Sequence, residues 1–177
     1  MTFIVTLVAL IQSFSISLGV GASTLAIVNF FAAIADGTID AAERRMMGIV
    51  YIVLRVAMVV ILLTTLFIIV TEQALNNIGE LSAFSFGQIT ALALLFLNAI
   101  LMTLNVMPST FGPAIQAGSW YALGTLAALL PLGLTNFSYF EFLLAFITWI
   151  VLAVAIVNAV MAIMNAKREE REKENPA

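Results

Sequence analysis

The chain has 177 residues, of which 63% are hydrophobic and only 10% are charged. Soluble domains carry about 25% charged residues, so this composition excludes an ordinary water-soluble fold and predicts an all-α, polytopic transmembrane bundle. The net charge of −3 provides no basic patch for nucleic acid, and the sequence contains no Cys and no His. Because disulfides, thiol chemistry and most zinc or haem sites need those residues, we expect no metal and no cofactor.

Five apolar runs, separated by polar breaks, predict five membrane spans. The first run ends at Asp36 and Gly37, and the spacing of Asp40 and Glu43 indicates a capping box that starts the second helix. Pro113 suits the first turn of the fourth helix, where its missing N–H costs nothing. The predicted spans cover residues 2–35, 46–71, 86–107, 113–134 and 137–166, and a charged tail follows at 167–177.

The basic residues predict how the chain crosses the membrane. Arg44 and Arg45 lie in the first connector, and the other basic residues outside the apolar runs lie in the tail from Lys167 onward. Cytoplasmic loops are enriched in Lys and Arg, so both segments are expected inside, which requires an even number of spans between them. The four intervening runs satisfy that requirement. They place the N-terminus outside, the tail in the cytoplasm, and the acidic connector with Glu72 and Glu80 outside.

Small residues form two adjacent rows along the first predicted helix. Each row has a spacing of four, which lets another helix backbone approach closely in lipid. We expect this helix-packing face to serve contacts within the bundle, a homo-oligomer, or the wall of a polar path. The rows consist of Ser13, Ser17 and Gly21, and of Ser15, Gly19 and Ser23.

Several polar side chains lie inside apolar runs and are candidates to line a polar path. Arg55 is a functional candidate because intramembrane charges are rare, although its long stem also lets it reach the head groups from the cytoplasmic half. Intramembrane amides either fix helix register or line a hydrated route. Glu141 lies near the outer end of the fifth run, too far from Arg55 for a pair to be expected. The candidate path consists of Gln12, Arg55, Asn98 and Asn105.

The segments 9–21 and 36–43 resemble the opening of a group of small bacterial membrane proteins and, more distantly, copper-resistance protein D-like membrane domains. The resemblance covers roughly the first 45 residues. Those domains carry a His where this chain has Gln12, seven residues before the Gly19 and Gly21 pair. The resemblance implies a helical bundle of the bacterial inner membrane and implies no activity, since the His is missing.

We find no catalytic motif, so the leading hypothesis is a non-enzymatic bundle that acts through helix packing, as a homo-oligomer or as a subunit of a membrane complex. One alternative is a small transporter or channel whose path is lined by the serines of the first helix and by Asn98 and Asn105. A second alternative is a membrane enzyme without a recognisable motif. The expected surroundings are the lipid bilayer of the cytoplasmic membrane, with no nucleic-acid partner.

Overall fold

The structure is a computed structural model that describes residues 2–36, 40–76, 81–108 and 111–174. These residues form five α-helices and contain no strand. The side chains of Asp36, Glu72, Arg171 and Lys173 lie outside the described part, and so does the whole of Glu80. The helices are α1 (Thr2–Asp36), α2 (Ala41–Asn76), α3 (Ala83–Thr103), α4 (Gly112–Leu129) and α5 (Tyr139–Glu174).

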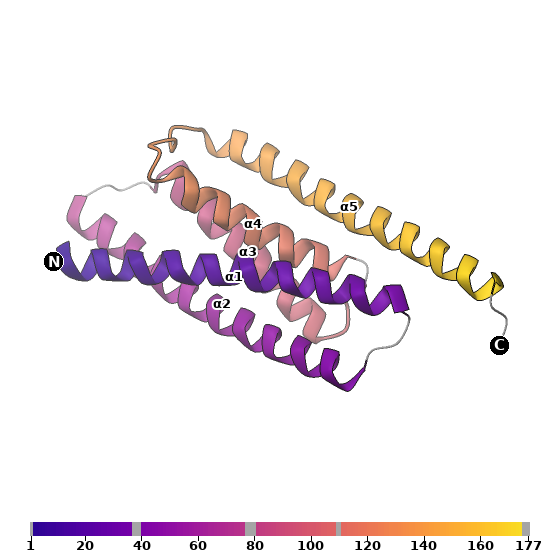
Figure 1. Cartoon of the computed structure of the whole chain (residues 1–177). Helices are drawn as coiled ribbons and strands as arrows, with labels where there is room; N and C mark the ends of the chain where they lie inside the picture. Colours follow the sequence, from indigo (N-terminus) through magenta and orange to yellow (C-terminus); the bar gives the residue numbers. More distant parts are fainter. Residues whose placement is uncertain (1, 37–39, 77–80, 109–110, 175–177) are drawn as a thin grey trace.

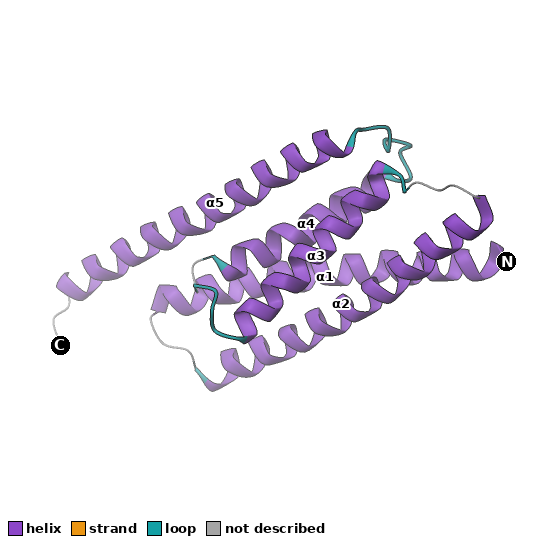
Figure 2. Cartoon of the chain, turned by 180° about the vertical axis from the view of Figure 1, so that it is seen from behind, coloured by secondary structure: helices purple, strands orange, loops and turns teal. Residues whose placement is uncertain are grey.

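The helices form an elongated bundle in which neighbours along the chain run in opposite directions (Figure 1). α4 lies in the middle of the bundle, and α5 runs along its flank, as the reverse view also shows (Figure 2). The start of α2 and the end of α5 lie at the same end of the bundle, opposite the N-terminus. The basic residues of both segments therefore share one end, as their predicted common side of the membrane requires.

In the part of the chain that the structure describes, four helices are long and apolar enough to cross a membrane: Phe3–Ala32, Ala41–Thr71, Ala83–Thr103 and Tyr139–Glu170. This finding supports a membrane-embedded helical bundle, because a helix rising 1.5 Å per residue needs about 20 apolar residues to span the core. α4 does not belong to this set. It has only 18 residues, several of which are polar or glycine.

The composition of α4 fits its central position. It packs against α1, α3 and α5, and it has buried residues along most of its length. A helix surrounded by protein meets little lipid, so its sequence need not be strongly apolar. Its buried residues are Gly112, Ala114, Ala117, Gly118, Ser119, Trp120, Leu123 and Leu126.

Glycines allow the helices around α4 to approach closely. A Cβ placed on Gly118 would lie 2.9 Å from Ile150 Cδ1 of α5, and one on Gly124 would lie 2.9 Å from Val20 Cγ2 of α1. On α5, Trp149 donates its Nε1–H to the Gly118 carbonyl oxygen at 2.9 Å. Small residues at helix contacts are typical of membrane bundles, where packing rather than hydrophobic burial holds helices together.

The helix ends are set by local chemistry. The predicted capping box is confirmed: Asp40 Oδ1 accepts the Glu43 N–H at 2.7 Å, and Glu43 Oε2 accepts the Asp40 N–H at 3.0 Å. This box starts α2 at Ala41, five residues before the predicted apolar span at 46. α3 ends four residues earlier than predicted, because Asn105 adopts a left-handed φ of 56° and the Val106 N–H bonds to the Leu101 carbonyl.

The end of α4 also differs from its prediction at 134. The helix stops at Leu129, and Gly133 takes a left-handed φ of 69° while the Leu134 N–H bonds to the Leu129 carbonyl. Pro131 lies between Leu129 and Gly133. It disfavours the helical conformation of the preceding residue and has no backbone N–H to donate, so it opposes continuation of the helix. α5, by contrast, continues past the predicted apolar end at 166 to Glu174, so the beginning of the charged tail is helical.

Candidate functional site

A cavity with a polar side lies between α2 and α3, and we call it the Arg55 cleft. It has a volume of about 220 Å³, and it forms where α2 and α3 make few backbone contacts. Gln116 of α4 also lines it, although α4 and α2 approach each other only through side chains. The lining consists of Tyr51, Leu54, Arg55, Met58, Ala99, Met102, Thr103 and Gln116.

A buried amide network supports Gln116 from behind. Asn98 is 1% exposed, and its Nδ2 donates to the Gly112 carbonyl at 2.9 Å and to Gln116 Oε1 at 2.8 Å. With its oxygen engaged, Gln116 turns its Nε2 towards α2, 3.6 Å from Met58 Sδ. Asn98 Oδ1 is buried and has no hydrogen-bond partner among the described residues. The amides therefore join α3 to α4 and fix the direction of Gln116.

Among the described residues that line the cleft, Arg55 alone is charged. Arg55 is exposed on α2, and within the described residues it has no ion pair and no hydrogen bond. Gln116 and Tyr51, whose side chains also carry hydrogen-bond donors, belong to the lining as well. The described part of the lining therefore combines one positive charge with side chains that can donate hydrogen bonds, and it includes no carboxylate.

The residues predicted to form one polar path are separated by apolar core. Gln12 of α1 donates its Nε2 to Thr65 Oγ1 of α2 at 2.8 Å. Thr65 lies two helical turns from Met58, which faces the Arg55 cleft, and fully buried Ile61 lies between them. Asn105 is exposed at the end of α3, where its backbone terminates the helix. Arg55 and Asn98 belong to neighbouring groups linked through Gln116, whereas Gln12 and Asn105 lie apart from them.

The two small-residue rows of α1 are not adjacent, as the sequence analysis expected, but lie on nearly opposite sides of the helix, because an offset of two residues turns an α-helix by about 200°. Ser15, Gly19 and Ser23 are buried in the bundle, where Gly19 packs against the indole of Trp120 of α4. Ser13, Ser17 and Gly21 are exposed, and a Cβ on Gly21 would meet nothing within 4 Å. The inner row thus supports packing within the bundle, and the outer row leaves a thin, unoccupied helix face.

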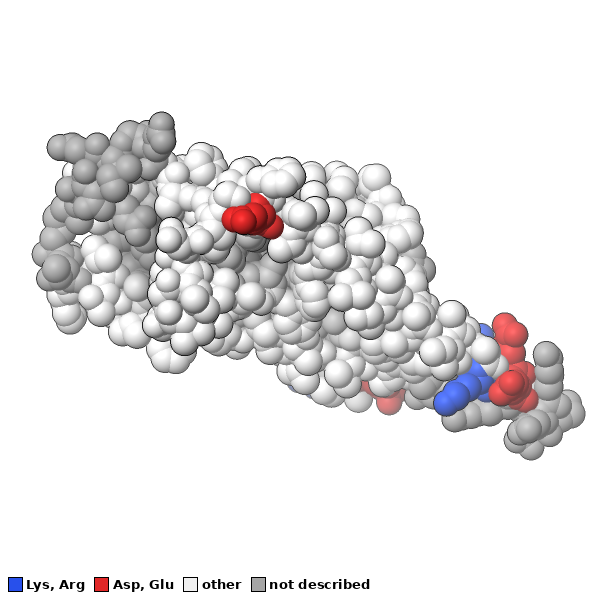
Figure 3. All heavy atoms as spheres, turned by 90° about the horizontal axis from the view of Figure 1, so that it is seen from above, with Lys and Arg blue, Asp and Glu red and all other residues white. Residues whose placement is uncertain are grey.

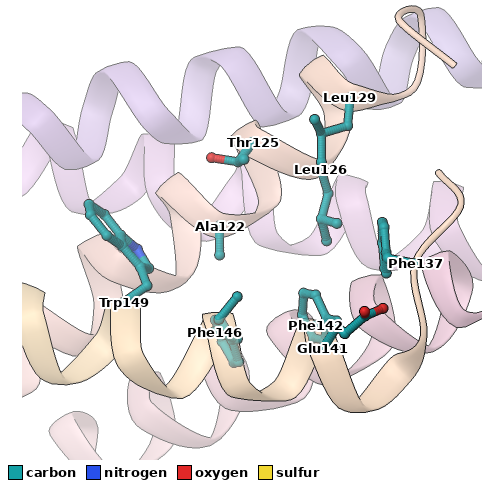
Figure 4. A pocket seen from close by; sticks show the side chains of 10 residues that line it. Ala122, Thr125, Leu126, Leu129, Phe137, Glu141, Phe142, Phe146 and Trp149 are labelled. Atoms are coloured by element: carbon teal, nitrogen blue, oxygen red, sulfur yellow. The ribbon is translucent and has the colours of Figure 1, made fainter. Parts of the chain in front are cut away.

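A second, larger cavity lies between α4 and α5 and has a volume of about 470 Å³ (Figure 4). Its walls are apolar and aromatic, with Phe142 and Phe146 stacked at a centroid distance of 5.4 Å. Glu141 lies at its rim, where its Oε2 accepts the Ser138 N–H at 2.7 Å and the Ser138 hydroxyl at 2.9 Å. The Glu141 N–H in turn bonds to Ser138 Oγ at 3.2 Å.

Glu141 is therefore part of a second capping box, at the start of α5. The spacing of Ser138 and Glu141 in the sequence would have allowed this box to be predicted. We expect Glu141→Gln to change the melting temperature little, because Gln also closes such a box. Ser138→Ala should cost about 0.5–2 kcal/mol, the usual value of an N-cap side chain. Thermal melting of the detergent-solubilised variants measures both effects. Equal destabilisation by the two substitutions would contradict the capping role.

Charge is distributed unevenly over the surface. On the face shown in Figure 3, basic side chains gather near one end of the molecule and most of the remaining surface is uncharged. Large apolar side chains such as Phe3, Phe14 and Phe140 are more than 70% exposed. Soluble monomers rarely expose apolar side chains over such an extended area, so this surface is suited to lipid.

Comparisons with protein-family models, with curated proteins and with solved structures find no match.

Sequence patterns pointed to Arg55 and Asn98 but missed the residue that connects them. Gln116 lies four residues inside α4, in a segment whose register relative to α3 cannot be read from one sequence. Tyr51 and Arg55 are four residues apart and share a face of α2, which was an available signal. Asn98 was recognised as an intramembrane amide, but nothing in the sequence indicated that it bonds to Gln116.

Proposed function

We propose that this protein is a five-span, non-enzymatic bundle of the bacterial cytoplasmic membrane that acts through helix packing, as a homo-oligomer or as a subunit of a larger complex. In this proposal α4 also crosses the membrane, which brings the number of spans to five; the N-terminus is outside and the tail of α5 is in the cytoplasm. At 1.5 Å per residue, the 18 residues of α4 cover about 27 Å, close to the thickness of the hydrocarbon core.

The outer row of α1 is the observation that supports an assembly role. Ser13, Ser17 and Gly21 are exposed on a helix whose opposite row is already used inside the bundle. An unoccupied small-residue row in lipid lets a second helix come within backbone contact, which is how many membrane helices associate. The neighbouring exposed Phe14 and Leu18 would frame such a contact with larger side chains.

The apolar interior of the bundle also favours a packing role over transport. Ile61 of α2, Leu95 of α3 and Leu123 of α4 belong to one apolar core cluster, and all three are at most 1% exposed. Closely packed apolar side chains leave no hydrated route for a polar solute. A transporter built on this arrangement would have to separate these helices.

The assembly proposal predicts that Gly21→Leu weakens association and leaves the fold intact. The added side chain would project from the outer row, where nothing in the monomer obstructs it. Gly48→Leu is the matched control, since Gly48 is also exposed and unobstructed but lies on α2. Native mass spectrometry of protein gently extracted from its own membrane measures the stoichiometry. If wild type and Gly21→Leu show the same assembly, the outer row is not the interface.

A further inference from the structure

We propose that the Arg55 cleft binds the anionic head group of a membrane lipid. The occupant would be an anionic phospholipid in the half of the membrane that faces the start of α2. Its phosphate would pair with the Arg55 guanidinium, and its acyl chains would lie against the apolar walls of the cleft. The site does not depend on the proposed assembly through α1, which uses a different helix face.

The charge of the cleft is the first support. Arg55 lies ten residues beyond Arg45 on α2, so their Cα atoms are about 15 Å apart along the helix. Within the described residues no carboxylate pairs with the Arg55 side chain. An uncompensated guanidinium at such a depth is costly in hydrocarbon, and it is stabilised by an anion that it can bind with two parallel hydrogen bonds.

A second donor is held in place beside it. Asn98 donates to the Gln116 oxygen at 2.8 Å, and the Gln116 Nε2 group points to Met58 of α2, which also lines the cleft. Its described partner is Met58 Sδ at 3.6 Å, a weak acceptor, which leaves an N–H available. Gln116 and Arg55 come from different helices, α4 and α2, and both line the same cavity. A buried amide network that fixes a donor towards a charged cavity is a feature of a formed site rather than of a freely snorkelling arginine.

The remaining lining explains why the ligand should be a lipid rather than a soluble anion. Leu54, Ala99 and Met102 make most of the wall apolar, and the cavity of about 220 Å³ is far larger than one water molecule requires. The adjoining surface of α3 is also apolar, formed by Phe96, Ile100 and Leu104. A ligand with an anionic head and an apolar tail satisfies both parts of the surface at once.

The experiment is a titration of the purified full-length protein in detergent with phosphatidylglycerol or phosphatidylcholine, followed by native mass spectrometry. We expect the wild type to bind one phosphatidylglycerol in preference to phosphatidylcholine. Arg55→Gln should weaken phosphatidylglycerol binding about tenfold to a hundredfold, the usual loss for a charged hydrogen-bond partner. Arg45→Gln, which removes a basic residue of the same helix outside the cleft, should leave binding unchanged.

Two further variants keep the test independent of folding. Ala99→Leu narrows the cleft without changing charge and should also weaken binding, whereas Arg55→Lys should retain a reduced preference for the anionic lipid. Equal binding of both lipids, or equal losses in Arg55→Gln and Arg45→Gln, would overturn the proposal. Displacement of the lipid by inorganic phosphate alone would overturn it too, by identifying a site for a soluble anion.

Discussion

Gly19→Ala is expected to destabilise the bundle more than any other single methyl addition in the described helices. A Cβ at this position would overlap the six-membered ring of Trp120, which is itself fully buried. The indole cannot move aside without displacing α4, and overpacking of this kind costs about 1–3 kcal/mol. Thermal melting in detergent, with helicity followed by circular dichroism, measures the loss.

Two variants separate this steric effect from a general effect of alanine. Gly21→Ala lies two residues away on the same helix and meets nothing within 4 Å, so it should melt at or above the wild-type temperature. Trp120→Leu removes the obstructing ring and leaves a cavity, but combined with Gly19→Ala it should recover part of the lost stability. A double variant that is as unstable as the sum of the single variants would show that Gly19 and Trp120 do not act on each other.

Asn98→Leu is expected to have the second-largest effect, because it removes both side-chain bonds that join α3 to α4. The Gly112 carbonyl and Gln116 Oε1 would lose their described partner. Interhelical hydrogen bonds in membranes are worth about 0.6 kcal/mol on average and about 1.7 kcal/mol at most, so a loss of roughly 1–3 kcal/mol is expected for the pair. Melting of the purified variant measures it.

Asn158→Leu is the matched control for that experiment. Asn158 lies on α5, and its Nδ2 bonds only to the Val154 carbonyl one turn earlier in the same helix. Both substitutions replace an amide by the same apolar side chain, so their difference isolates the bonds between helices. If Asn158→Leu destabilises the protein as much as Asn98→Leu does, the amide network does not hold α3 to α4.

Helix positions and helix starts could be predicted from the sequence because their causes are local. The apolar runs gave all five helices, and the Asp40 and Glu43 spacing gave a capping box that the hydrogen bonds confirm. Helix ends were less predictable. The left-handed conformations at Asn105 and Gly133 that end α3 and α4 depend on how the chain turns towards the next helix.

The contents of the site could be predicted only in part, since contacts between helices depend on rotation and register. The small residues of α1 were recognised as a packing face, but which of the two rows is buried depends on the position of Trp120. In the same way, Gln12 pairs with Thr65, a residue that carried no signal of its own. The sequence analysis placed these polar residues in one path because all of them lie in apolar runs. In the structure they lie at different positions along the length of the bundle and so form separate groups.

Labelling of introduced cysteines tests most directly whether α4 crosses the membrane, as a total of five spans requires. The natural chain has no cysteine, so single substitutions report without background. Val106→Cys precedes α4 and Asn136→Cys follows it, and both positions are exposed. We predict that a membrane-impermeant thiol reagent labels Asn136→Cys in intact cells and labels Val106→Cys only after the membrane is opened. Labelling of both positions from the same side would contradict the account.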